Sequence, residues 1–126
     1  MSYIYYNANP DGKHVGDCVI RAIATVMDDT WDAISADLSM MQLRMRDMSN
    51  SDAVWGEYLH QNGFVKGILP HPCPNCVTVK EFCEIFPHGR YVVATGHHVI
   101  AVIDGNYIDT TDTGNEVLIY YWRRIE

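Results

Sequence analysis

The chain has 126 residues, of which 48% are apolar and 20% are charged, a composition typical of one folded domain with a single hydrophobic core. Nine lysines and arginines stand against sixteen aspartates and glutamates, so the net charge is -7 and the scattered basic residues exclude the broad basic surface that nucleic-acid-binding proteins use. We therefore expect a single domain over residues 1–126, with no nucleic acid among its partners.

The N-terminus and the hydropathy pattern bear on where the protein resides. Residues 1–7 lack the basic region and long apolar core of a signal peptide. No apolar run approaches the roughly 18 residues that a membrane-spanning helix needs. These features predict a cytoplasmic protein with no membrane partner. Because cytoplasmic thiols stay reduced, we expect packing, metal-binding or reactive roles rather than disulfides for Cys18, Cys73, Cys76 and Cys83.

The first segment predicts a short strand and then a helix that carries a cysteine. Residues 3–6 are aromatic and β-prone, and they end at a turn cluster of Asn, Pro, Asp and Gly. Apolar residues then recur at helical spacing over residues 18–27, and Asp17 is the natural N-cap. Cys18 is therefore expected in the first turn of a buried helix.

Two further helices are expected in the middle of the chain. One starts at Thr30 and runs toward Leu43, and its methionines at helical spacing are expected to fill the core. The next follows the cap-like sequence Ser49-x-x-Asp52 and stops before Gly63. A strand over residues 64–69 is expected after it.

The C-terminal half predicts one short helix and then strands. Thr78-x-x-Glu81 is a capping box for a helix that ends before Pro87. Asp104-Gly105 is a strong signal for a two-residue hairpin turn. Helices come first and antiparallel strands last, so we predict an α+β fold in which the cysteine-bearing helix packs on a C-terminal antiparallel sheet. The expected strands are residues 91–95, 99–103, 106–110 and 117–122.

The C-terminal hairpin supplies partners for a reactive thiol. A thiol attacks carbonyl carbon efficiently only as a thiolate, which a helix N-terminus and a nearby imidazole both stabilise. With Asp104-Gly105 at the turn, His98 and Asp109 are diagonal neighbours on one face, with Cα atoms about 7–8 Å apart. If the turn is centred on Gly105-Asn106 instead, the two side chains still share a face but lie farther apart. On the other face, His97 lies opposite Asp112. Strand pairing alone does not choose between the two pairs.

Three motifs in order resemble a known family. They are Gly16-Asp17-Cys18-Val-Ile-Arg-Ala-Ile, Pro87-x-Gly-x-Tyr-Val-Val-Ala, and the run from His98 through Val-Ile-Ala-Val-Ile-Asp-Gly-Asn-Tyr-Ile to Asp109. This set is similar to the papain-like cysteine peptidase superfamily, especially its small bacterial members of the bacteriocin-processing type.

The resemblance implies a papain-like fold and assigns a role to each motif. It implies Cys18 as the nucleophile, His98 as the base and Asp109 as the orienting carboxylate, and so favours His98 over His97. The implied activity is hydrolysis or transfer of an amide through a thioester on Cys18. The substrate would be a peptide, a protein or a small amide, and no cofactor is expected.

One part of the family pattern is missing. Papain-like enzymes generally place a Gln shortly before the cysteine to stabilise the oxyanion, yet residues 10–17 contain no Gln or Asn. We expect Asn9, or else Asn7, to serve with the backbone N–H of Cys18. Without such a donor the chain would be an inactive papain-like binding or interaction module, which is the first alternative.

The second alternative is a zinc-stabilised regulatory domain. His71-x-Cys73-x-x-Cys76 contains the Cys-x-x-Cys half-site that is common in zinc proteins, and Cys83 follows seven residues later. The second half of such a site is poor, because Cys83 lies beside Phe82 in a predicted helix and is expected to pack in the core. We therefore expect no metal.

Overall fold

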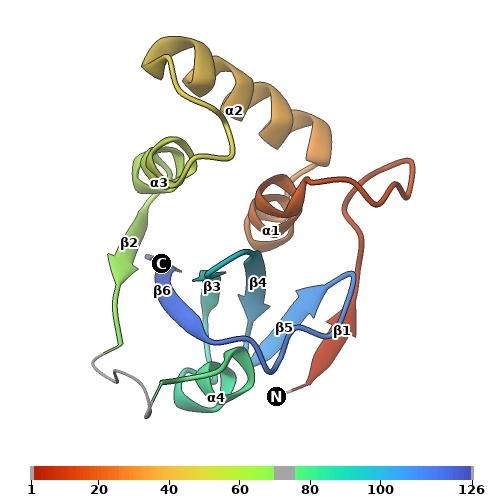
Figure 1. Cartoon of the computed structure of the whole chain (residues 1–126), viewed down its shortest axis with the longest axis vertical. Helices are drawn as coiled ribbons and strands as arrows, with labels where there is room; N and C mark the ends of the chain where they lie inside the picture. Colours follow the sequence, from red (N-terminus) through yellow and green to blue (C-terminus); the bar gives the residue numbers. More distant parts are fainter. Residues whose placement is uncertain (1, 70–75, 126) are drawn as a thin grey trace.

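The computed structural model describes residues 2–69 and 76–125, which form a six-stranded sheet with helices on both faces (Figure 1). The elements in chain order are β1 (Tyr3–Tyr5), α1 (Cys18–Met27), α2 (Trp31–Met45), α3 (Asp52–Gln61), β2 (Phe64–Gly67), α4 (Val79–Ile85), β3 (Arg90–Thr95), β4 (Val99–Ile103), β5 (Asn106–Asp109) and β6 (Leu118–Arg124).

The sheet is mixed rather than purely antiparallel. Its strand order is β1-β5-β4-β3-β6-β2, and β1 pairs with β5 in parallel while the other neighbours are antiparallel. The α+β prediction is confirmed, but an entirely C-terminal, antiparallel sheet is wrong because β1 and β2 form its two edges. The ring of Tyr3 on β1 packs 5.6 Å from that of Tyr107 on β5, which joins the N-terminus to the sheet.

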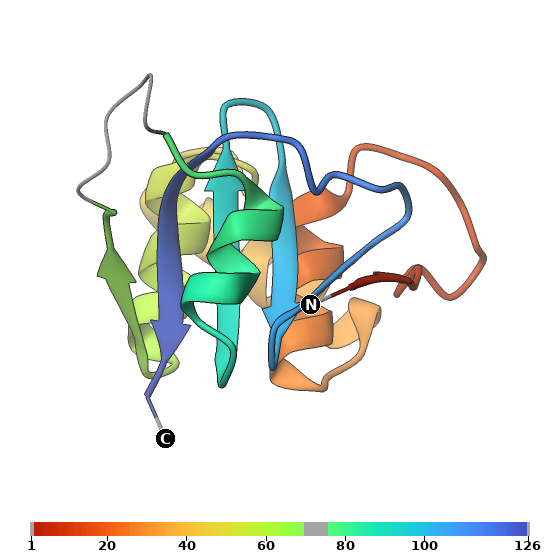
Figure 2. The same ribbon diagram turned by 90° about the horizontal axis from the view of Figure 1, so that it is seen from below.

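The sheet buries both faces under helices. Figure 2 shows α4 on one side of the sheet and α1, α2 and α3 on the other. The larger core lies between α1, α2, α3 and the sheet, and it contains Ile23, Leu38 and Trp55. The smaller core lies under α4 around Phe82 and Tyr107. Burial on both faces explains why β3 and β4 read as continuous apolar runs instead of alternating ones.

The hairpin turn formed as its sequence predicts. Asp104 and Gly105 both have positive φ, 48° and 78°, as a two-residue turn of type I′ requires. The register pairs Ile103 with Asn106 and Val102 with Tyr107. The end of β5 is thereby fixed against the start of β4.

The helix predictions hold except at some ends. Thr30 caps α2 by accepting a hydrogen bond from Ala33 N–H, and Thr78 and Glu81 form the expected capping box of α4. The start predicted for α3 is wrong, because its N-cap is Ser51 and makes no side-chain cap bond. The backbone N–H of Ser49 instead donates to Oε1 of Gln42.

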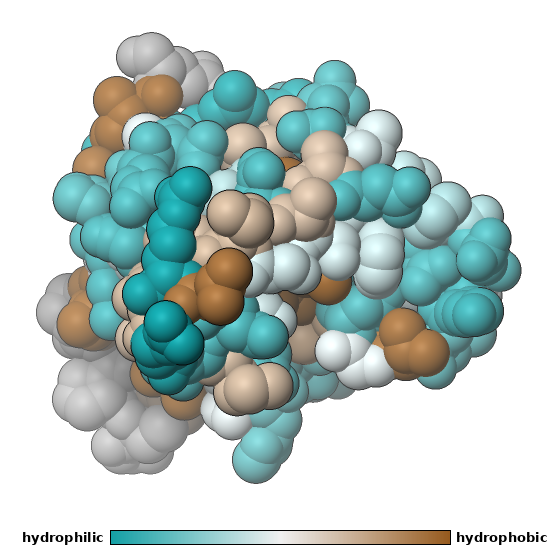
Figure 3. All heavy atoms as spheres, turned by 90° about the horizontal axis from the view of Figure 1, so that it is seen from above, coloured by the Kyte–Doolittle hydropathy of each residue, from teal (hydrophilic) through white to brown (hydrophobic). Residues whose placement is uncertain are grey.

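The four methionines in and just after α2, Met40, Met41, Met45 and Met48, mostly do not fill the core. Met41 is buried, but Met40, Met45 and Met48 are exposed, so that prediction is wrong for three of the four. On the face shown in Figure 3, hydrophobic residues are scattered among hydrophilic ones. Among the helices described, none is long and apolar enough to cross a membrane.

Candidate active site

Cys18 is the first residue of α1 and is partly exposed. Asp17 occupies the N-cap position as predicted, but its side chain makes no cap bond and instead accepts hydrogen bonds from other side chains. The first N–H groups of a helix have no intrahelical acceptor, so their partial positive charge acts on the thiol. This position favours the thiolate form of Cys18.

His98 and Asp109 meet where β4 begins and β5 ends. Nε2 of His98 lies 2.6 Å from Oδ2 of Asp109. The Asp109 side chain is 2% exposed and that of His98 is 22% exposed, so a buried carboxylate holds an imidazole that solvent and substrate can reach. The diagonal contact expected from the hairpin is therefore present.

The same imidazole lines one cavity together with the thiol of Cys18, and each group shifts the pKa of the other. Hydrogen bonds with Asp109 and then with Cys18 raise the pKa of His98 to about 10. Burial alone would raise the pKa of Cys18, but hydrogen bonds from His98 and from Val99 N–H, with the charges of His98 and Arg21, lower it. The geometry thus favours a thiolate–imidazolium pair.

Asp109 is fixed by four hydrogen bonds. Oδ1 accepts from the backbone N–H of Thr110 at 2.7 Å and from Nη1 of Arg21 at 3.0 Å. Oδ2 accepts from His98 and from the hydroxyl of Thr113 at 3.3 Å. Burial would raise the pKa of Asp109, but these hydrogen bonds and the positive charge of His98 hold it below its ordinary value. Asp109 is therefore a fixed anion that can stabilise the imidazolium.

Arg21 links Asp109 to Asp17, the residue just before α1. Its Nε donates to Oδ1 of Asp17 at 2.7 Å while its Nη1 reaches Asp109, and its side chain is 11% exposed. Oδ2 of Asp17 in turn accepts from Nε1 of Trp31 at 2.9 Å and from Nδ2 of Asn9 at 3.3 Å. This chain of ion pairs holds the helix that carries Cys18 against the strand that carries Asp109.

The rival pair on the hairpin does not meet in the structure. His97 is exposed, and its backbone N–H donates to Oγ1 of Thr95 at 3.4 Å. Oδ1 of Asp112 accepts from the hydroxyl of Tyr107 at 2.6 Å and from Gly114 N–H at 3.0 Å. The Asp112 carboxylate therefore anchors a ring of the smaller core rather than an imidazole.

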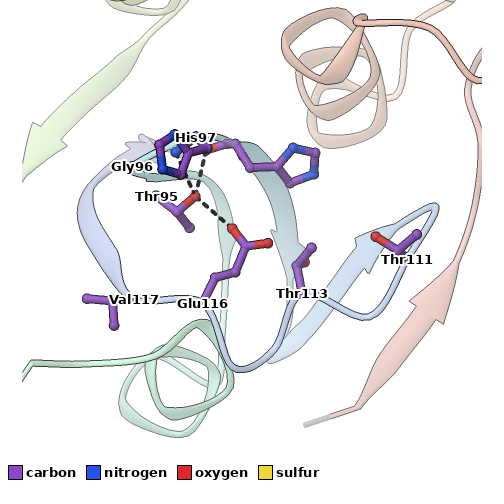
Figure 4. A pocket seen from close by; sticks show the side chains of 8 residues that line it. Thr95, Gly96, His97, Thr111, Thr113, Glu116 and Val117 are labelled. Atoms are coloured by element: carbon purple, nitrogen blue, oxygen red, sulfur yellow. Dashed lines mark hydrogen bonds between the residues drawn. The ribbon is translucent and has the colours of Figure 1, made fainter.

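Two cavities border the site. The first, which we name the Cys18 cavity, has a volume of about 270 Å³ and is lined by Cys18, Asn50, Trp55 and His98 among others. The second, which we name the Glu116 cavity, measures about 500 Å³ and is lined by His98 and Glu116 but not by Cys18 (Figure 4). Thr95, Gly96, His97 and His98 line both cavities, so the loop between β3 and β4 separates them.

Asn9, the oxyanion donor expected from the sequence, has other contacts. Its side chain is buried, with Nδ2 donating to Asp17 and Oδ1 accepting from Asp11 N–H at 3.0 Å. It lines a cavity beside Trp31 rather than the Cys18 cavity. Asn7 accepts from Asn9 N–H and donates to the carbonyl of Lys13, so it braces the same loop.

Of the two described cysteines in the middle segment, Cys76 differs from the expectation and Cys83 agrees with it. Cys76 is disulfide-bonded, so the reading of this cysteine as a reduced thiol is wrong. A disulfide sulfur is not the thiolate that zinc binds, which argues against the zinc alternative. His71 and Cys73 lie outside the described residues. Cys83 is fully buried as expected, and burial raises the pKa of its thiol to about 11.

Three polar residues of the site were missed by sequence reasoning. Arg21 and Thr113 support Asp109, and Asn50 lines the Cys18 cavity. Arg21 could have been noticed in the sequence, because it is the one charged residue in the helix pattern of residues 18–27 and lies three positions after Cys18. Thr113 and Asn50 lie outside the helices and strands and left no signal.

No known protein-family model, curated protein or solved structure matches this chain. The resemblance to papain-like peptidases therefore rests on the sequence motifs of Cys18, His98 and Asp109 and on the arrangement of these side chains.

Proposed function

We propose that this chain is a papain-like thiol hydrolase that cleaves or transfers an amide or related acyl bond through a thioester on Cys18. The observation that carries the proposal is one imidazole, that of His98, which is hydrogen-bonded to a buried Asp109 and lines the same cavity as Cys18. A nucleophile, a base and a group that orients the base are the minimum set for this chemistry.

The proposed reaction begins with the thiolate of Cys18. The thiolate attacks the carbonyl carbon, and a tetrahedral oxyanion forms as the C–S bond is made. The imidazolium of His98 then gives its proton to the leaving amine, and the C–N bond breaks to leave a thioester. His98, now neutral, removes a proton from water, which attacks the thioester and releases the acid. Asp109 balances the charge of His98 whenever it is protonated.

The oxyanion must be stabilised by donors near Cys18. The backbone N–H of Cys18 belongs to the unpaired first turn of α1, so it is one candidate. The side-chain amide of Asn50 is a second candidate, since Asn50 lines the Cys18 cavity and is exposed to it. Asn9 remains a prediction from the sequence, although its amide already donates to Asp17.

A second candidate function is a papain-like binding module without catalytic activity. The observation in its favour is that Asn9 faces a different cavity from Cys18. Such a module would still have a reactive thiol, because the helix start and His98 lower the pKa of Cys18 whether or not an oxyanion donor is present. It would not transfer an acyl group.

Acyl transfer separates the two functions. The protein is incubated with a small acetyl thioester, and intact and peptide mass spectrometry follow the acetylation of Cys18 and its hydrolysis over time. The hydrolase requires Cys18 to be acetylated faster than a free neutral thiol, N-acetylcysteinamide, and then regenerated. The Cys18→Ala variant is the blank. Fast alkylation of Cys18 by iodoacetamide without acetyl transfer would establish the binding module instead.

A further inference from the structure

The Glu116 cavity contains a carboxylate that the proposed reaction does not use. Glu116 precedes β6, and in Figure 4 its carboxylate lies at the centre of the labelled side chains. Oε1 of Glu116 accepts a hydrogen bond from the hydroxyl of Thr95 at 2.8 Å. Thr111 and Thr113 also line this cavity. Most of its exposed lining is apolar, and the Glu116 carboxylate is a polar group on that lining that can accept further hydrogen bonds.

Among the residues that the structure describes, no cation lies within ion-pairing distance of the Glu116 carboxylate. The ion pairs found among the described residues involve Arg21, His60 and His98 as cations, and none includes Glu116. His98 also lines the Glu116 cavity, but its charge is already paired with Asp109 at 2.6 Å. The cavity is thus suited to a positively charged group and unsuited to an anion.

The position of the Glu116 cavity indicates which side of the scissile bond it can bind. In thioester formation the acyl group becomes attached to Cys18, while the leaving group takes a proton from His98. The Cys18 cavity touches both residues, whereas the Glu116 cavity touches His98 alone. The leaving group therefore lies on the side of the Glu116 cavity.

We propose that the Glu116 cavity binds a positively charged group in the leaving portion of the substrate, such as the basic side chain of the residue that follows the cleaved amide bond. This inference deepens the proposed hydrolase and rests on it for the identity of the leaving group. Glu116 is the specificity-determining residue, and Thr111, which also lines the cavity, has a hydroxyl oxygen that can accept a hydrogen bond from a guanidinium or ammonium.

If the role of Glu116 were purely structural, the effect of replacing it by glutamine would be different. Through Thr95, Glu116 supports the loop that carries His97 and His98, because Oγ1 of Thr95 also contacts the carbonyl of His98 at 3.3 Å. Glu116→Gln separates the two roles, since a glutamine oxygen can still accept from Thr95 while the charge is gone. A structural brace would survive this change, and a cation site would not.

The reaction test uses two thioesters that differ by one charge in the leaving group. They are acetylthiocholine and its uncharged carbon analogue, S-(3,3-dimethylbutyl) thioacetate. In each case the Cys18 thiolate forms the new C–S bond, the old C–S bond breaks, and the departing thiolate takes the proton from His98. The ratio of the two acetylation rates at Cys18 is measured by mass spectrometry, and the ratio for N-acetylcysteinamide corrects for intrinsic reactivity.

We expect the corrected preference for the cationic thioester to fall about fivefold in Glu116→Gln, the upper range for a partly exposed ion pair. Asp52→Asn is the matched control, because Asp52 lines the Cys18 cavity and its loss removes the same charge on the acyl side. It should leave the preference nearly unchanged. An equal loss in both variants would mean general electrostatic attraction and would overturn the site.

A binding test works even if Cys18 does not react. L-argininamide and L-citrullinamide, which share the same α-amino group and differ in having a charged or an uncharged side chain, are titrated into Cys18→Ala while the backbone amide NMR signals of Thr95 and His97 are followed. Argininamide should shift these signals and citrullinamide should not, and adding Glu116→Gln should abolish the shift. An inert Cys18 with intact argininamide binding would overturn the hydrolase and keep the cation site. If Cys18 reacts but its preference for the cationic thioester is the same in Glu116→Gln as in the unmodified protein, the cation site is overturned and the hydrolase is kept.

Discussion

Nε2 of His98 lies 2.6 Å from Oδ2 of Asp109, although the two residues belong to different strands and are separated by eleven positions in the chain. The Asp104-Gly105 turn brings them together by folding β5 back on β4. The Asp109 carboxylate is buried and the His98 imidazole is partly exposed, so the protein holds the carboxylate in place while a substrate can reach the imidazole. This asymmetry is what a base that must meet a substrate needs.

The first prediction concerns the reactivity of the thiols. Because contacts with His98, Val99 N–H and Arg21 lower the pKa of Cys18 despite its burial, Cys18 should react with iodoacetamide near pH 6 at least tenfold faster than Cys83. Cys83, whose pKa is raised by burial to about 11, is the internal control. Peptide mapping by mass spectrometry gives both rates, and equal rates would mean that Cys18 is an inert thiol.

The second prediction assigns the effect to one histidine. His98→Ala should abolish the fast alkylation of Cys18 near pH 6, since it removes the imidazolium that stabilises the thiolate. His97→Ala should change the rate less than twofold, because His97 is exposed and bonded only through its backbone to Thr95. Circular dichroism and melting must first show that both variants fold. The opposite result would move the active site to the other face of the hairpin.

Local sequence signals predicted most of the elements, and they also predicted the hairpin that joins His98 and Asp109. The turn dipeptide fixes the register, and the register fixes which side chains share a face, so the pairing of His98 with Asp109 was one of two pairs that adjacent residues predicted, and the family resemblance favoured it over His97 with Asp112. The capping box of Thr78 and Glu81 is predictable for the same reason.

The contacts that were missed join distant parts of the chain. Arg21 and Asp109 are 88 residues apart, and no periodicity or turn signal states that α1 will present its arginine to the end of β5. The parallel pairing of β1 with β5 is equally remote in sequence. Asp17 was predicted as a cap because of its position, but a strong acceptor near Arg21 and Trp31 gains more from those donors than from the helix N–H groups.

The third prediction concerns Asp109 itself. Asp109→Asn should reduce the fast alkylation of Cys18 to an intermediate rate, because an amide oxygen can accept the imidazole N–H but does not stabilise its charge. Asp112→Asn is the matched control and should have little effect, since Asp112 is bonded to Tyr107 and Gly114 instead. The pH dependence of the rate provides the measurement. A rate profile for Asp109→Asn identical to the unmodified protein would remove Asp109 from the site.

The fourth prediction treats Arg21 as a positioning residue. Arg21→Met keeps the length of the side chain but leaves the buried carboxylates of Asp17 and Asp109 without their shared cation, so we expect a loss of about 3 kcal/mol in the free energy of unfolding. Arg21→Lys should lose less, because the ammonium keeps a positive charge beside the two carboxylates, but it should still lose some stability because one ammonium cannot bond both carboxylates as the guanidinium does. Urea unfolding measures both losses.

A second readout separates positioning from simple stability. Arg21→Met should also shift the alkylation profile of Cys18 to higher pH, because Arg21 contributes to the lowered pKa of that thiol. In a purely structural role, the unfolding free energy would fall while the alkylation profile of the folded fraction stayed in place.

The fifth prediction is the response of stability to acid. Hydrogen bonds and charge hold the pKa values of Asp17 and Asp109 below the ordinary value of 3.8, although burial opposes this. Carboxyls with a lowered folded-state pKa contribute stability that is fully present above the unfolded pKa and is lost as the pH falls through the folded one. Unfolding free energies measured from about pH 6 to pH 2 should therefore decline below about pH 4. Asp17→Asn should be less stable near pH 6 and decline less steeply, and an unchanged slope would contradict the assignment.

The last prediction separates the two asparagines that are candidates for the oxyanion donor. Acetyl transfer from a thioester passes through an oxyanion, whereas alkylation by iodoacetamide does not, so a true donor affects the first rate and not the second. Because Asn50 lines the Cys18 cavity, Asn50→Ala should slow acetylation of Cys18 by at least tenfold and leave alkylation unchanged. Asn9→Ala should mainly lower the melting temperature, since it removes a hydrogen bond from buried Asp17. Loss of acetylation in Asn9→Ala alone, with alkylation intact, would return the role to Asn9 as the sequence predicted. If neither variant affects acetylation, the backbone N–H of Cys18 and its neighbours in the first turn of α1 must stabilise the oxyanion without side-chain help.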